Sequence, residues 1–124
     1  MQTKQIARNE WPSFFDGFSR QHQGWLVTLE VFSPDIGDQI EERELALEGI
    51  TAELTNDEKD RIEIMIGVQP DDHVTHTIAN PIEVSLEQTD EGADEVLAIK
   101  GTDEATTLLR ICSAVRAEMV DGVV

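Results

Sequence analysis

The sequence has one cysteine, few basic residues and no long apolar run, and each shortage narrows the range of functions. A single cysteine among 124 residues cannot form an internal disulfide. No apolar run approaches the ~20 residues that a helix needs to span a bilayer. The first ten residues, MQTKQIARNE, lack the apolar segment of a secretory signal. We therefore expect a cytoplasmic protein with no membrane partner.

The shortage of basic residues also excludes nucleic acid as an expected partner. Nine Lys and Arg stand against 26 Asp and Glu, which gives a net charge of −17. Nucleic-acid binding normally needs a basic patch that displaces counterions from phosphates, and none follows residue 25. Residues 1–25 are nearly neutral, so we expect them to dock on the acidic domain. The alternative is that they meet an acidic partner.

The residues that are present predict one domain, 1–124, with a core of ordinary size, since 40% of the chain is hydrophobic. Residues 10–22 read as a helix, with Asn9 as the N-cap and Pro12 in the first turn. Aromatic side chains share one face of this helix at spacings of three and four: Trp11, Phe14, Phe15 and Phe18. We interpret this face as core that covers a sheet, and the alternative is an aromatic ligand-binding face.

From Gly24 onward the pattern switches to period two, which is typical of strands. In residues 38–48 the phase breaks as a β-bulge would break it, and Gly49 is expected to turn the chain into a separate short strand. About seven short strands at roughly ten-residue spacing predict an α+β fold. Its N-terminal helix packs on a strongly curved antiparallel sheet or small β-barrel of six to eight strands.

The periodicity also predicts which side chains are buried. The expected core comprises Trp11, Phe15, Phe18, Val27, Leu29, Ile62, Ile64, Ile66, Val84, Leu86, Leu109 and Ile111. Ile82 is expected to point inward with Val84, and Cys112 to be a small buried hydrophobe. The apolar tail 113–124 is expected to dock or to join an oligomer.

The main polar cluster is the segment Asp71, Asp72, His73 and His76. Two histidines three residues apart share a helix face and can bind one metal there, whereas a strand sends them to opposite faces. We expect a strand, and therefore structural or surface histidines. A metal site and acid–base catalysis are the alternatives. The acidic pairs, Asp94–Glu95 among them, are expected to be solvated surface, and His22 to lie near the helix C-terminus. No nucleotide or cofactor motif occurs, so no cofactor is expected.

Longer stretches resemble a known family. EWPSFFDGFSRQHQGWLVTLEV, ELALEGITAEL, IMIGVQPDDHVTHTI, VSLEQTDEGADEVLAI and TTLLRICSA resemble an uncharacterised bacterial family, the domain of unknown function numbered 5335. The resemblance covers nearly the whole chain and implies a compact domain of this length. It carries no assigned activity, so no catalytic residue follows from it. It includes the junction from Trp11 to Trp25, and these two residues complete the candidate surface.

The leading hypothesis is a small acidic, non-catalytic binding or interaction module. Its partner is expected to be another protein, a small ligand or a second copy of the chain in a homodimer, because sheet edges and an apolar tail need cover. The alternative is a metal-dependent or acid–base enzyme that uses the segment from Asp71 to His76. A third hypothesis, a structural protein adapted to high salt, rests on the acidity alone.

Overall fold

A computed structural model describes residues 2–35, 37–55, 59–67 and 71–116 of the chain. One α-helix and a single eight-stranded antiparallel sheet make up these residues, with the strand order β1-β6-β7-β8-β2-β3-β4-β5. The elements are β1 (Gln2–Ile6), the short 3-10 helix η1 (Arg8–Glu10), α1 (Trp11–His22), β2 (Trp25–Ser33), β3 (Gly37–Glu53), β4 (Arg61–Ile66), β5 (Val74–Ala79), β6 (Pro81–Gln88), β7 (Asp94–Gly101) and β8 (Thr106–Arg116). The α+β prediction is confirmed. The sheet is open, with β1 and β5 at its two edges, so the barrel alternative does not describe it.

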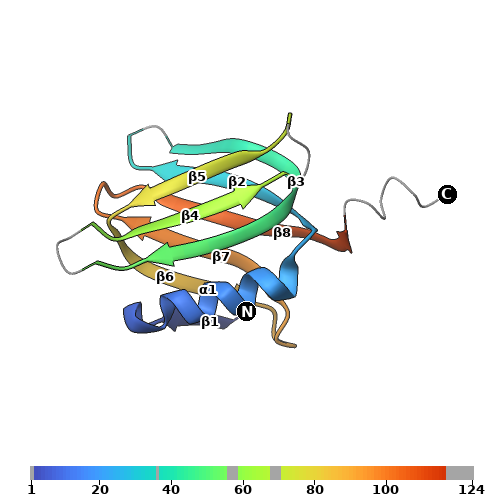
Figure 1. Ribbon diagram of the computed structural model, residues 1–124, viewed down its shortest axis with the longest axis horizontal. Helices are drawn as coiled ribbons and strands as arrows, with labels where there is room; N and C mark the ends of the chain where they lie inside the picture. Colours follow the sequence, from blue (N-terminus) through green and yellow to red (C-terminus); the bar gives the residue numbers. More distant parts are fainter. Residues whose placement is uncertain (1, 36, 56–58, 68–70, 117–124) are drawn as a thin grey trace.

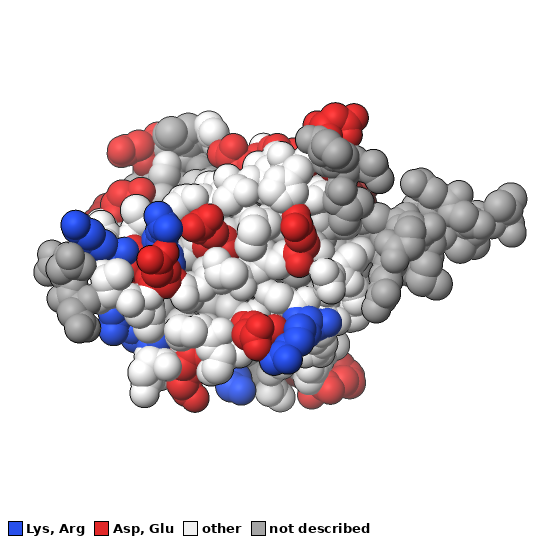
Figure 2. All heavy atoms as spheres, in the orientation of Figure 1, with Lys and Arg blue, Asp and Glu red and all other residues white. Residues whose placement is uncertain are grey.

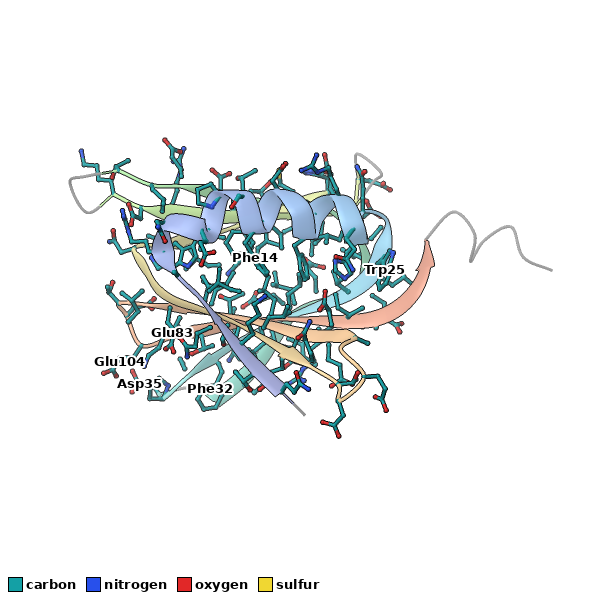
Figure 3. All side chains as sticks on the ribbon, turned by 90° about the horizontal axis from the view of Figure 1, so that it is seen from below. Phe14, Trp25, Phe32, Asp35, Glu83 and Glu104 are labelled. Carbon is teal, nitrogen blue, oxygen red and sulfur yellow. The ribbon has the colours of Figure 1, made fainter. Side chains whose placement is uncertain are left out.

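The long strand β3 gives the sheet its curvature. Its first half pairs with β2 and its second half with β4, so the sheet folds over into two layers (Figures 1 and 3). The predicted turn at Gly49 is wrong, because Gly49 lies inside β3 and pairs with Met65. The predicted bulge is confirmed by register shifts on either side of Leu29 and by the positive φ of 50° at Glu44.

Helix α1 covers the edge of β3 that β2 leaves unpaired. The Ser19 hydroxyl accepts a hydrogen bond from the Ile50 N–H at 2.8 Å and donates one to the Ile50 carbonyl at 3.1 Å. The helix therefore satisfies backbone groups that a neighbouring strand would otherwise satisfy. Its start differs from the prediction: the N-cap position is Glu10, not Asn9, because Arg8–Glu10 form a 3-10 turn, and no side chain caps the helix.

The core lies between the two layers and follows the predicted alternation. All the predicted core residues are buried except Ile111, which is partly buried against the core. Two inward predictions are wrong. Ile82 is 54% exposed, because the register shifts between Pro81 and Glu83. Cys112 is exposed as well, since it lies on the outer face of β8, with its Sγ 3.0 Å from the Thr28 hydroxyl.

The N-terminal segment docks on the domain, as expected. Strand β1 pairs with β6, and the Arg8 guanidinium makes a two-pronged contact with the Asp60 carboxylate at 2.8 and 2.9 Å. The Thr55 N–H, a hydrogen-bond donor, lowers the pKa of Asp60, and Arg8 lowers it further against the opposing effect of burial. The predicted docking of the tail cannot be followed to its end, because residues 117–124 lie outside the described residues. No helix in the described part of the chain has the length and apolar character to cross a bilayer.

Candidate functional site

The structure gives the two histidines of the Asp71–His76 segment different neighbours. His73 precedes β5, and its Nε2 lies 2.6 Å from a carboxylate oxygen of Glu48. His76 lies within β5 on the face that points toward the core, and its Nε2 is 3.4 Å from the Thr107 hydroxyl. Asp71 is exposed and Asp72 is half-buried. Among the described residues, no group of three or more His, Cys, Asp or Glu is placed to hold a metal ion.

His76 lines a slot between the edge strand β5 and strands β2 and β8. The slot has a volume of about 230 Å³, and its walls include Val31, Ile78, Asp103 and Thr107. Burial lowers the pKa of His76, and the nearby Glu41 carboxylate on β3 opposes that effect. Glu41 and Asp103 therefore give the surroundings of the slot a negative charge.

Strand β5 forms one lip of this slot, and its outer edge is unpaired. Within the described residues it pairs with β4 alone. Its sequence, VTHTIA, is rich in β-branched residues and contains no lysine or proline of the kind that blunts exposed strand edges. Its outward side chains, Thr75, Thr77 and Ala79, are exposed and uncharged. On the face shown in Figure 2, acidic side chains are scattered across broad uncharged areas.

A second concave feature, the α1 groove, lies between helix α1 and strands β1 and β6. It has a volume of about 370 Å³ and is lined by Lys4, Phe14, Gly17, Phe18, Gln21, Gln88 and other residues. Phe14 points from α1 toward the strands beneath the helix (Figure 3).

A buried polar network borders the α1 groove. His22 is 1% exposed, and its Nδ1 donates to the Phe18 carbonyl at 2.9 Å. Its Nε2 lies 3.2 Å from Asp94 Oδ2, and the Gln88 side-chain amide donates to Asp94 Oδ1 at 2.8 Å. Both nitrogens of the ring thus face oxygen atoms, one from a backbone carbonyl and one from a carboxylate. The expectation that Asp94 belongs to the solvated surface is therefore wrong.

The two tryptophans of the candidate surface have structural surroundings. Trp11 is buried, and its indole N–H donates to the Ile6 carbonyl at 2.9 Å. Trp25 is half-buried, and its ring lies nearly perpendicular to the His22 ring, at 79°, with centroids 4.6 Å apart. In Figure 3 it lies beyond the C-terminal end of α1. Trp25 thus supports the network behind the α1 groove, and Trp11 anchors the start of the helix.

A third hollow is less suited to a ligand. It has a volume of about 390 Å³ and is lined by Asp60, Ile82 and Thr102 among others. Both carboxylate oxygens of Asp60 already accept hydrogen bonds from Arg8. The one carboxylate in this hollow is therefore already engaged.

Comparisons with known proteins give a family and no activity. A family model described as "Family of unknown function (DUF5335)" matches residues 2–119. A protein of Aquifex aeolicus (strain VF5), described as "Uncharacterized protein", is 32% identical over 117 residues, which cover 93% of this chain and 96% of the relative. No solved structure matches the chain.

Proposed function

Because the chain belongs to the DUF5335 family, whose function is unknown, we propose its function from geometry: it is a non-catalytic interaction module. The unpaired edge of β5 carries this proposal. Its partner is an extended, positively charged segment of another protein, which adds to β5 as a further strand. Main-chain hydrogen bonds then supply affinity, and pockets for alternate side chains supply specificity.

The unpaired backbone groups along the edge of β5 support strand addition. Alternate residues of β5 direct their N–H and C=O groups away from β4, and among the described residues no strand pairs with these groups. An incoming strand would satisfy these groups. The inward-facing side chains of this incoming strand would enter the slot beside His76. There Val31 and Ile78 would contact the aliphatic parts of those side chains.

The negative charge of the chain favours a positively charged partner. Asp103 lines the slot, the Glu41 carboxylate lies near His76, and the chain carries a net charge of −17. Lysine and arginine suit such a slot because their aliphatic stems pack on apolar surface while their charged ends reach carboxylates. The same net charge raises the cost of bringing two copies of the chain together, which favours a cationic partner over a homodimer.

The test uses two synthetic peptides that alternate valine with lysine or valine with glutamate. We expect the lysine peptide to shift the backbone NMR signals of residues 74–79 and to slow their hydrogen exchange. The glutamate peptide should do neither. Thr77→Lys should weaken binding of the lysine peptide, because it places a positive charge on the edge strand itself.

Thr51→Lys is the matched control. Thr51 and Thr77 are exposed residues that flank Glu63 in the same row across β3, β4 and β5, but Thr51 lies away from the β5 edge. Equal weakening by both substitutions would show that net charge alone matters, and the edge would not be the site. A dimer of the free protein that Thr77→Lys dissociates would overturn the cationic partner in favour of a second copy.

A further inference from the structure

The α1 groove contains a glycine that the fold itself does not require. Gly17 lies in the middle of α1, where glycine destabilises a helix relative to alanine. A Cβ built on Gly17 meets nothing within 4 Å, so no neighbouring group excludes a side chain. Glycine at such a position keeps the helix backbone open to close approach from outside. The open space above Gly17 is part of the α1 groove.

The aromatic lining of the α1 groove suits a flat molecule. Phe14 is the one half-buried aromatic side chain of α1, and the Phe18 ring beside it is buried. The two ring centroids are 5.8 Å apart and the rings are tilted by 34°. Aromatic rings pack well against such surfaces in offset or edge-to-face geometry.

The polar groups of the α1 groove favour a negative charge on that molecule. Lys4 reaches the groove from β1 and makes no ion pair with any described residue, although the chain holds 26 acidic residues. Gln21, on the last turn of α1, keeps its side-chain amide donors unengaged among the described residues. The Asp94 carboxylate is held at both oxygens, by His22 and by Gln88. The groove therefore offers an ammonium group without an ion pair among the described residues, while its one carboxylate is already engaged.

We propose that the α1 groove binds a small planar organic anion, with its ring over Gly17 against Phe14 and its anionic group at Lys4. Such pockets typically combine an apolar wall with a few polar groups that orient the ligand, in volumes of roughly 300–1,000 Å³. The α1 groove, at about 370 Å³, is at the small end of this range. This site is separate from the β5 edge and does not depend on the function proposed for it.

The test uses 8-anilinonaphthalene-1-sulfonate, an aromatic anion with a planar naphthalene ring system, whose fluorescence rises on binding. We expect saturable binding to the folded protein, with NMR shift changes confined to residues 3–5, 13–21 and 86–94. N-phenyl-1-naphthylamine, a neutral analogue, should bind about tenfold more weakly, since it loses one charge-assisted contact. Gly17→Leu should abolish binding by filling the space above the helix. It should also leave the protein folded, because leucine is a better helix former than glycine.

Two matched controls separate a site from a general effect. Lys4→Glu should weaken binding of the anion about tenfold, whereas Lys100→Glu makes the same charge change at another lysine that has no ion pair among the described residues, and should have little effect. Asp16→Leu adds an exposed leucine to α1 outside the groove and should leave binding intact. Equal weakening by the two lysine variants, or unchanged binding to Gly17→Leu, would overturn the proposal.

Discussion

Replacing Ser19 with alanine tests how helix α1 holds the second half of β3. The hydroxyl of Ser19 satisfies both backbone groups of Ile50, which is 2% exposed. Its removal leaves a buried N–H and a buried C=O without a partner, and each such group costs about 1–3 kcal/mol. The better helix propensity of alanine returns about 0.5 kcal/mol. Because Ser19 is only half-buried, water can relieve part of the loss, and we expect a net destabilisation of about 2 kcal/mol.

Thermal and urea unfolding of Ser19→Ala measure this loss. Destabilisation by ~1 kcal/mol lowers the melting midpoint by about 4 °C in a domain of this size, so the midpoint should fall by about 8 °C. Hydrogen exchange at the Ile50 amide should also accelerate. Ser13→Ala is the control, because the exposed Ser13 hydroxyl donates only to the Glu10 carbonyl at the start of the same helix. A loss in Ser19→Ala no larger than that in Ser13→Ala would refute the reasoning.

Three further predictions concern pH, a close backbone approach and metal. Stability should fall as the pH drops below 6.5, because burial lowers the pKa of His76 in the folded state and the unfolded chain takes up the proton first. Urea midpoints measured across this pH range should fall less for His76→Gln than for the wild type. Gly67→Ala should lower the free energy of unfolding by more than about 3 kcal/mol, since the φ of Gly67 is 87° and a Cβ there overlaps the Asp72 carbonyl. Gly92 has a similar φ of 89° but open space around it. Gly92→Ala should therefore lower the free energy of unfolding by only about 1 kcal/mol in the same denaturation assay. Excess EDTA should leave the thermal midpoint unchanged, because a structural zinc site would need the three histidines and the one cysteine to converge; a fall in the midpoint that the His73→Ala, His76→Ala double variant no longer shows would contradict this.

Local patterns in the sequence predicted the elements better than their partners. The alternation of Ile62, Ile64 and Ile66 depends only on residues within one strand, and it predicted their burial. The turn expected at Gly49 failed because β3 changes partner near that residue and continues as one strand. A glycine signals a turn locally, whereas pairing with two other strands is a property of the whole sheet.

Both candidate sites depend on contacts between residues that are far apart in the sequence. The segment around His76 was visible in the sequence, but the unpaired edge of β5 follows from the strand order, which single-strand patterns do not determine. The contact between His22 and Asp94 joins the helix to the distant start of β7. A weak signal existed, because His22 continues the spacing of four that relates Phe14 to Phe18 on the buried helix face.

The strand order also determines how much of the chain can fold while the ribosome is still making it. Strand β2 borders β8, and β1 borders β6, so two of the first strands to be synthesised wait for partners from the second half of the chain. Helix α1 and strands β2–β5 are neighbours in sequence and in space, and they can associate earlier. One edge of β2 therefore stays unpaired until β8 emerges, and a topology with such distant pairings folds slowly. We expect truncation before β8 to leave β2 without one of its two neighbours and to yield a chain that aggregates.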